Sequence, residues 1–208
     1  MKKTFIVILG VLVVIGALFM NAARTSADGY GVGDTVKDFS LRNVDGKMVS
    51  LSDYKNAKGF IVTFTCNTCP YANGYETRIM DLDKKYASKG FPVIAINPND
   101  VERVPEDSME AMKKRSGEKG YTFPYLRDDS QEVAKAFGAA KTPHVYVLSN
   151  NGGIFKVEYI GAIDDNPNDP DHVDEQYVGD AVDALLAGKS PEVKEKRAIG
   201  CTIKWKQS

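Results

Sequence analysis

The sequence predicts an α/β fold with a central mixed β-sheet flanked by helices. Two short apolar runs, FIVTF at 60–64 and FPVIAIN at 91–97, have the composition of buried strands, and a segment with helical periodicity lies between them. Two later runs, at 144–149 and 154–163, are joined by the turn sequence NNGG and predict a strand pair. Strands that alternate with helices and then end in a hairpin indicate a mixed sheet.

The first element expected after the N-terminal region is a hairpin. The segments FSLRNV (39–44) and KMVSLSDY (47–54) flank Asp45-Gly46, which is a strong signal for a hairpin turn. After the strand at 60–64, apolar positions at helical spacing predict a long helix that Gly90 closes. These positions are Ala72, Tyr75, Ile79, Leu82 and Tyr86.

The second half continues the alternation of helices and strands. Helices are expected at 108–120 and 130–140, on either side of the short strand FPYL. The segment YVGDAVDALLAG at 177–188 predicts a last amphipathic helix. We therefore expect one domain over residues 28–190, followed at 191–208 by a tail that packs on the domain or trails from it.

The first 27 residues have the layout of an export signal. Lys2 and Lys3 precede an uncharged apolar run that ends at Met20, and small residues such as Ala23 and Ala27 follow. The run is longer than an ordinary signal core and short for a membrane span. Residues 1–27 are therefore either a cleaved signal peptide or an N-terminal membrane anchor, and both interpretations place the rest of the chain outside the cytoplasm.

The charge balance does not favour nucleic acid as a partner. Without residues 1–27 the chain has 24 basic and 28 acidic residues, a net charge of −4. The short basic runs at 113–115 and 194–197 are typical of solvated helix faces rather than of a phosphate-binding surface.

The sequence FTCNTCP contains the main candidate site. Cys66 follows a predicted strand, Cys69 comes one turn later, and Pro70 fits the first turn of a helix. Unpaired N–H groups at a helix start favour a thiolate and lower a thiol pKa. We expect Cys66 to be an exposed attacking thiol and Cys69 to be a sheltered thiol that resolves a mixed disulfide.

A second element, KTPHVYVL, places Thr142 and Pro143 directly before an apolar strand. Together with FTCNTCP and the hairpin VYVLSNNGGIFKVEYIG, it resembles the thioredoxin superfamily. The closest likeness is to the exported redoxin branch that includes TlpA/ResA-like and AhpC/TSA-like proteins. The resemblance implies a thioredoxin-like fold with an N-terminal β-hairpin extension, Cys66 and Cys69 as a redox pair, and a cis-proline loop at Thr142 and Pro143 that faces substrate.

The same resemblance implies an activity and its partners. A member of this branch is a periplasmic or otherwise extracytoplasmic thiol-disulfide oxidoreductase that needs no cofactor or metal. It exchanges disulfides with protein thiols or disulfides and is served by a membrane thiol-electron donor or acceptor. Two positions depart from the pattern, because Thr65 stands where a Trp is usual and Ala72 where ResA-like proteins have an acid. Glu76 is the nearest substitute for that acid.

Two other functions remain open. A peroxiredoxin-like peroxidase is favoured by Thr63, three residues before Cys66, but the proline expected seven residues before the cysteine is Gly59. A Sco-like copper chaperone would suit thiolate ligands. Such proteins, however, have the spacing CxxxC and a later histidine loop.

Two further side chains have open roles. His144 either tunes the pKa of Cys66 or is a simple strand residue. Cys201 is an odd third cysteine that is free and structural, intermolecular, or a partner of the redox pair, and the structural role is our default.

Overall fold

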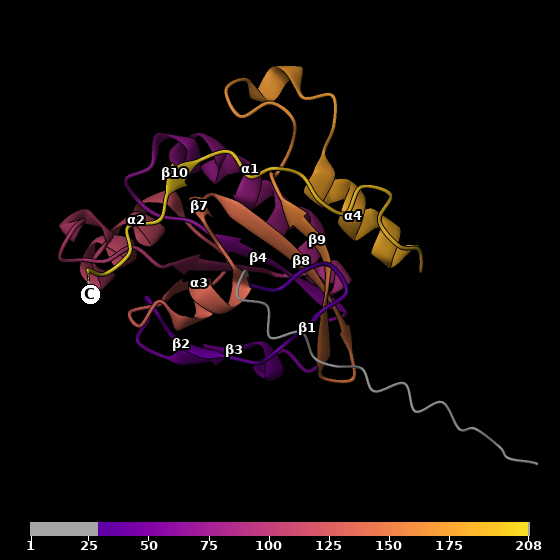
Figure 1. The fold of residues 1–208 in the computed structure, drawn as a ribbon, viewed down its shortest axis with the longest axis horizontal. Coiled ribbons are helices and arrows are strands. Elements are labelled where there is room, and N and C mark those ends of the chain that lie inside the picture. The colour runs from indigo at the N-terminus through magenta and orange to yellow at the C-terminus, as the bar shows by residue number, and fades with distance from the viewer. Residues whose placement is uncertain (1–28, 208) are drawn as a thin grey trace, which may run out of the picture.

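The computed structural model describes residues 29–207 and has an eight-stranded mixed sheet at its centre (Figure 1). In spatial order the strands are β1 (Thr35–Val36), β9 (Ile154–Gly161), β8 (His144–Asn151), β4 (Gly59–Phe64), β5 (Val93–Asn97), β6 (Tyr125–Arg127), β2 (Ser40–Asn43) and β3 (Met48–Ser50). Strands β4, β5 and β6 are parallel, whereas β8 runs antiparallel to β4. The predicted mixed sheet is confirmed.

Helices cover both faces of this sheet. Within residues 29–207 the α-helices are α1 (Pro70–Tyr86), α2 (Met109–Lys119), α3 (Glu132–Phe137) and α4 (Tyr177–Leu186). Alternate residues of β4 divide between the two cores: Ile61 packs with α1, α2 and α4, while Phe60 and Val62 pack with α3. Both faces of β4 are buried, which explains why its sequence is continuously apolar.

The expected hairpin forms and extends the sheet. Strands β2 and β3 are antiparallel around Asp45-Gly46, and Gly46 has a φ of 89°, which favours glycine. Strand β2 also pairs with β6, so the hairpin is an edge of the central sheet. The second predicted segment stops being a strand at Ser50, because the 3₁₀ turn Leu51–Asp53 follows.

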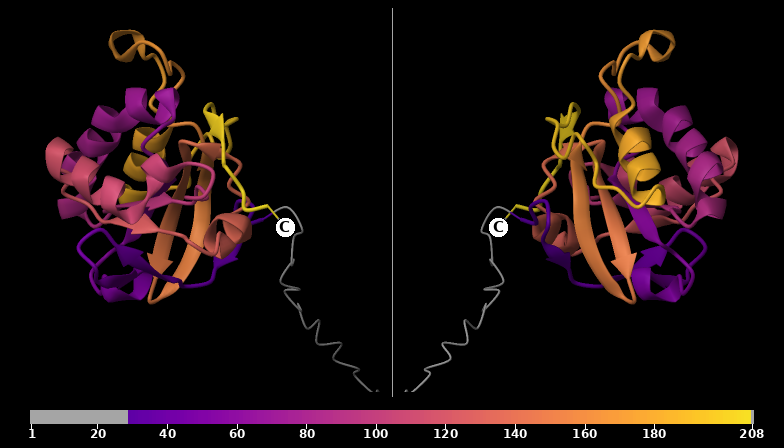
Figure 2. Two further views of the ribbon diagram at one scale, coloured as in Figure 1. Left: turned by 90° about the vertical axis from the view of Figure 1, so that its left-hand side faces the viewer. Right: turned by 90° about the vertical axis from the view of Figure 1, so that its right-hand side faces the viewer.

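The C-terminal segment folds back over the domain. Strand β10 (Cys201–Thr202) pairs antiparallel with β7 (Lys141–Thr142) in a second, two-stranded sheet that the sequence did not predict. Figure 2 shows this yellow segment beside the orange strands. The signal or anchor predicted for residues 1–27 lies outside the described part of the chain. From residue 29 to 207, no helix has both the length and the apolar character needed to cross a membrane.

Candidate active site

The structure brings the two predicted motifs together. Strand β4 ends at Phe64 and α1 begins at Pro70, so both cysteines lie in the connection at the helix start. The Thr142–Pro143 peptide bond is cis, as expected. Thr142 contacts both thiols: its Oγ1 lies 3.3 Å from the Sγ of Cys66, and its carbonyl oxygen lies 3.0 Å from the Sγ of Cys69.

Neither thiol of the pair is exposed, so the expected exposure of Cys66 is wrong. Cys66 is 4% exposed and Cys69 is 3% exposed. The cover comes in part from the C-terminal segment, where the backbone N–H of Cys201 donates to the Sγ of Cys69 at 3.3 Å. The Cys201 side chain also packs against the pair, and all three cysteines are free thiols.

The charge distribution also differs from the expectation for Cys66. The two thiols are hydrogen-bonded to each other, and this bond is the largest cause that lowers the pKa of Cys69 to about 4 and raises the pKa of Cys66. Burial and the nearby charge of Asp107 raise the pKa of Cys66 further. The Sγ of Cys69 also accepts the backbone N–H of Cys201, and Cys201 and the nearby N–H of Ala72 lower the pKa of Cys69 further.

One contact opposes a charge on Cys69. The Thr142 carbonyl oxygen, 3.0 Å from its Sγ, repels a thiolate and accepts the proton of a thiol. The neighbouring Cys66 thiol and the backbone N–H of Cys201, 3.3 Å from the Sγ of Cys69, favour the charged form of Cys69, and we therefore place the shared negative charge there. The cause is hydrogen bonding to the charged form, a mechanism that stabilises anions in buried sites.

The two residues between the cysteines are held by a buried carboxylate. Asp107 is 0% exposed, and its oxygens accept the backbone N–H of Asn67 at 2.7 Å and the hydroxyl of Thr68 at 3.3 Å. The Asn67 amide adds a hydrogen bond to the Glu106 carbonyl at 2.8 Å and accepts one from the Tyr125 hydroxyl at 3.0 Å. These contacts fix the backbone from which both thiols project.

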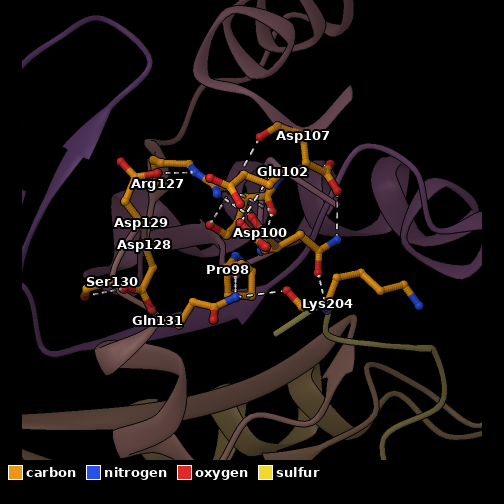
Figure 3. A network of polar contacts seen from close by, with 12 residues as sticks. Pro98, Asp100, Glu102, Asp107, Arg127, Asp128, Asp129, Ser130, Gln131 and Lys204 are labelled. Carbon is orange, nitrogen blue, oxygen red and sulfur yellow. Dashed lines mark hydrogen bonds and ion pairs between the residues drawn. The ribbon is translucent and has the colours of Figure 1, made fainter. Parts of the chain in front are cut away.

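Asp107 is itself part of a larger polar network (Figure 3). Its carboxylate accepts from the amides of Asn97 and Asn99 at 3.1 and 2.7 Å. The buried guanidinium of Arg127 donates to the backbone carbonyls of Asp107, Asn97 and Asn99. Because each of these buried polar groups has partners, the network forms a rigid base for the cysteine loop.

Glu76 lies close to the site but is engaged by cations. Its carboxylate pairs with Arg115 at 2.7 Å and Lys119 at 2.9 Å, and it accepts a hydrogen bond from Tyr121. Burial works to raise the pKa of Glu76, but these hydrogen bonds outweigh it and lower the pKa. Arg115 also donates to the carbonyl oxygen of Asn67 at 3.2 Å, so the ion pair supports the cysteine loop.

Glu76 and Cys66 line the same small pocket, together with Tyr121. The sequence-based role of Glu76 in proton transfer therefore stays a prediction, whereas its contacts give it a structural role.

The contacts of His144 are made with residues other than the two cysteines of the pair. Its Nδ1 accepts the backbone N–H of Ala140 at 3.3 Å, and its ring lies 4.9 Å from that of Tyr146. Burial lowers the pKa of His144 to about 4, which keeps the ring neutral at pH 7. Over residues 29–207 no cluster of three or more His, Cys, Asp or Glu side chains is arranged to hold a metal ion.

Sequence reasoning missed two features of the site, Asp107 and the position of Cys201. Asp107 lies 40 residues beyond Asn67 in the loop before α2, and nothing in its own sequence context marks it. Cys201 lies 132 residues beyond Cys69. The only available signal for Cys201 was that it is an unpaired third cysteine in a chain predicted to be exported.

Solved structures of other proteins resemble this chain over most of its length. An uncharacterized conserved protein from Geobacillus kaustophilus is 42% identical, covers 86% of this chain and 94% of its own, and superposes with a TM-score of 0.79. Two solved structures of lower identity share the thioredoxin-like fold, which confirms the predicted fold class: the peroxidoxin BcpB from Mycobacterium tuberculosis, with a TM-score of 0.51, and a putative thiol:disulfide interchange protein DsbE from Chlorobium tepidum, with a TM-score of 0.52.

Named relatives are more distant. The thiol-disulfide oxidoreductase ResA of Geobacillus thermodenitrificans is 25% identical over 152 residues, which are 73% of this chain and 83% of the relative. A putative peroxiredoxin of Mycobacterium tuberculosis is 27% identical over 122 residues, 59% of this chain and 73% of the relative. Residues 32–157, more than half of the sequence, match the profile of one family, and the chain belongs to that family, the AhpC/TSA family.

Proposed function

We propose that this chain is an exported enzyme that exchanges disulfides with protein substrates through Cys66 and Cys69. Its family and its similarity to ResA make it a thiol-disulfide oxidoreductase of the redoxin class. The observation that supports the CxxC pair as its centre is the contact of both thiols with Thr142, beside a cis-proline. Thr142 and Pro143 would then form the substrate-side loop.

The hydrogen bond between the thiols suggests how the pair works in the reducing direction. Cys66 attacks one sulfur of a substrate disulfide and gives its proton to the Cys69 thiolate, while the other substrate sulfur leaves. Cys69 then passes that proton to the leaving thiolate and attacks the Sγ of Cys66. The second substrate sulfur is released, and the pair ends as a disulfide.

The low pKa of Cys69 fits the reverse direction as well. When an external thiolate attacks Cys66 in the oxidised pair, Cys69 is expelled, and a sulfur of low pKa is the better leaving group. In this direct route Cys66 carries the mixed disulfide with a protein substrate in both directions. A membrane thiol donor or acceptor would reset the pair on the outer side of the membrane, where the predicted leader would place the domain.

The proposal is tested by trapping the mixed disulfide. Cys69→Ser leaves Cys66 with no resolving sulfur, so covalent adducts with substrate proteins should accumulate on non-reducing gels and disappear with dithiothreitol. Cys66→Ser should accumulate no such adducts with substrate proteins, and its insulin-disulfide reduction should fall well below that of the native protein. Adducts on Cys66→Ser but not on Cys69→Ser would reverse the two roles and contradict the proposed cycle.

Peroxidase activity is the second candidate function, and the similarity to the putative peroxiredoxin of Mycobacterium tuberculosis supports it. A peroxidatic cysteine forms a sulfenic acid with hydrogen peroxide much faster than an ordinary thiol does. We expect Cys69→Ser to react with peroxide slowly, because the remaining groups within hydrogen-bond reach of the Sγ of Cys66 are the neutral hydroxyls of Thr68 and Thr142, which bring no positive charge to stabilise a thiolate. Rapid sulfenic acid formation without protein adducts would instead establish the peroxidase.

A further inference from the structure

The C-terminal strap, residues 194–206, occupies the edge where a substrate is expected to pair. In the register of β10 and β7, Cys201 is opposite Thr142 and Thr202 is opposite Lys141. An extended peptide that adds to a strand edge forms backbone hydrogen bonds of this kind. The chain therefore places its own cysteine at the position that a substrate cysteine would take beside the redox pair.

The strap is fixed on both sides of Cys201. Before it, the backbone N–H of Lys196 donates to the Ile160 carbonyl at 3.0 Å. After it, the Ile203 side chain is 2% exposed within the core that contains α3, and its N–H donates to the Ala140 carbonyl at 3.2 Å.

The last part of the strap joins the polar network shown in Figure 3. Lys204 donates its N–H to Asn99 at 2.9 Å and accepts the Gln131 amide at 3.0 Å. The position of Cys201 is therefore built into the fold.

Three thiols meet at this point, and they differ in access. Cys66 and Cys69 are buried, whereas Cys201 is half-buried and packs against them. The N–H of Cys201 is 3.3 Å from the Sγ of Cys69, and the two side chains interact. Cys69 thus has a thiol on each side with which it can form a disulfide.

We propose that Cys201 is a third redox cysteine that forms a disulfide with Cys69 and gives external thiols access to the buried pair. The inference rests on the proposed function of the same site. In the internal step the Sγ of Cys201 attacks the Sγ of Cys69 in the Cys66–Cys69 disulfide. The Cys69–Cys201 bond forms, the Cys66–Cys69 bond breaks, and Cys66 gains the proton that Cys201 loses. No external oxidant is needed, because the centre has the same number of electrons before and after.

Access then follows from the positions of the sulfurs. An external thiolate, such as that of glutathione or a protein thiol, attacks the half-buried Sγ of Cys201 and expels Cys69 as a thiolate. The new bond is a mixed disulfide on Cys201. A second external thiol reduces this mixed disulfide, so the three cysteines end as thiols and the two external thiols end as one disulfide.

The first experiment maps disulfides in Cys66→Ser, which retains only Cys69 and Cys201. After incubation with oxidised glutathione and digestion without reductant, we expect one intramolecular Cys69–Cys201 disulfide in monomeric protein. Cys69→Ser is the control with the same number of thiols, and we expect its Cys66 and Cys201 to cross-link at least about tenfold more slowly. Glutathione adducts or dimers in Cys66→Ser, without the internal disulfide, would overturn the proposal.

A second comparison tests the geometry of the strap in the Cys66→Ser background. A Cβ on Gly200 would lie 2.2 Å from the carbonyl oxygen of Thr142, so Gly200→Val must displace β10 from β7. We expect disulfide formation to slow by about tenfold or more. Thr202→Ala lies on the same strand with an exposed side chain and should leave the rate unchanged. Equal rates for both variants would show that the strap does not position Cys201.

The last comparison measures access in the otherwise native chain. Cys201→Ser should still form the Cys66–Cys69 disulfide, but glutathione should reduce that disulfide about tenfold more slowly than in the native protein. A rate within about twofold of the native one would overturn the access role. Failure of the proposed function is a different result: the native protein would then form no Cys66–Cys69 disulfide, whatever Cys66→Ser does.

Discussion

The backbone N–H of Asn67 donates to the carboxylate of Asp107 at 2.7 Å, which ties the cysteine loop to a carboxylate with no exposed surface. The contact has two consequences. The contact fixes the geometry of the loop, and it places a negative charge near Cys66. The interaction with Cys69 and burial are the two largest causes that raise the pKa of Cys66, and the charge of Asp107 is the third. A charge that disfavours a thiolate also favours the disulfide over the reduced pair.

Asp107→Asn should therefore make the protein more oxidising. Loss of the charge removes its repulsion of the negative charge that the reduced pair carries, which stabilises the reduced pair and raises the reduction potential by tens of millivolts, at about 30 mV for each tenfold change in the equilibrium constant. The measurement is redox equilibrium with glutathione. Asp128→Asn is the control, because Asp128 is equally buried but its carboxylate accepts from Ala134 and Ser130 instead of the cysteine loop. A potential that falls, or that moves equally in both variants, would contradict the charge effect.

The reduced pair should carry one thiolate at pH 7. Because the pKa of Cys69 is lowered to about 4, the group is charged above that pH and loses its charge as the pH falls through it. Thiolate absorbance at 240 nm should therefore be present at pH 7 and disappear near pH 4. Cys66→Ala removes the principal hydrogen-bond donor and should move this midpoint upward, toward the ordinary thiol value of about 8.5. If Cys69→Ser retained the transition near pH 4, the charge would belong to another cysteine.

Local features of the fold were predictable from sequence, and distant contacts were not. The hairpin around Asp45-Gly46 and the start of α1 at Pro70 depend on short-range turn and helix signals. The loop at Thr142 and Pro143 was found through its resemblance to a family. In contrast, β10 is only two residues long, and its pairing with β7 depends on contacts across the whole domain. A periodic pattern cannot be recognised over two residues.

The pKa expected for Cys66 was wrong for the same reason. The helix-start argument considers only the local backbone, whereas the charge on the pair depends first on the interaction between the two thiols and then on two further features, Asp107 and the strap that carries Cys201. Both features come from distant parts of the sequence, so the two cysteines could be identified without knowledge of how the charge is divided between them.

His144 should make the folded protein sensitive to acid. Its pKa is about 4 in the folded protein and about 6.5 for an unperturbed histidine, so the unfolded chain binds more protons between these values. The contribution of a neutral, half-buried His144 is thus fully present above about pH 6.5 and is lost as the pH falls toward about 4. Urea unfolding of reduced protein at pH 7 and pH 4.5 measures this loss. His144→Asn should show a smaller loss, and an equal loss would exclude the histidine as its cause.

Glu76→Gln should affect stability more than thiol chemistry. The substitution leaves the largely buried Arg115 without its charged partner and removes the pairing of the exposed Lys119, at a cost of about 1–3 kcal/mol. Glu118→Gln is the control, because its pair with Lys114 is exposed and worth about 0–0.5 kcal/mol. Chemical unfolding of both variants checks the difference. The pH dependence of insulin reduction should be the same as that of the native protein, and a shifted profile would restore Glu76 as a proton-transfer group.

Thr63 separates the two candidate activities. A peroxidase would use its hydroxyl near Cys66, but in the described residues the Thr63 Oγ1 is buried and has no hydrogen-bond partner. Valine has nearly the same shape and removes that unpaired hydroxyl, so Thr63→Val should leave the free energy of unfolding unchanged or raise it by about 1 kcal/mol. Disulfide exchange should stay at the native rate.

Thr142→Val is the matched substitution at a hydroxyl that does contact a thiol. Its Oγ1 lies 3.3 Å from the Sγ of Cys66, so its loss removes a hydrogen bond that lowers the pKa of Cys66. We expect disulfide exchange to slow by up to about tenfold, the factor that corresponds to an increase of about 1.4 kcal/mol in the activation free energy. Stopped-flow reaction of both variants with a disulfide substrate and with hydrogen peroxide completes the comparison. If Thr63→Val lost its reactivity with peroxide while Thr142→Val exchanged disulfides at the native rate, the prediction would be wrong. The site would then be a peroxidatic one that depends on Thr63, and not a disulfide-exchange site that depends on Thr142.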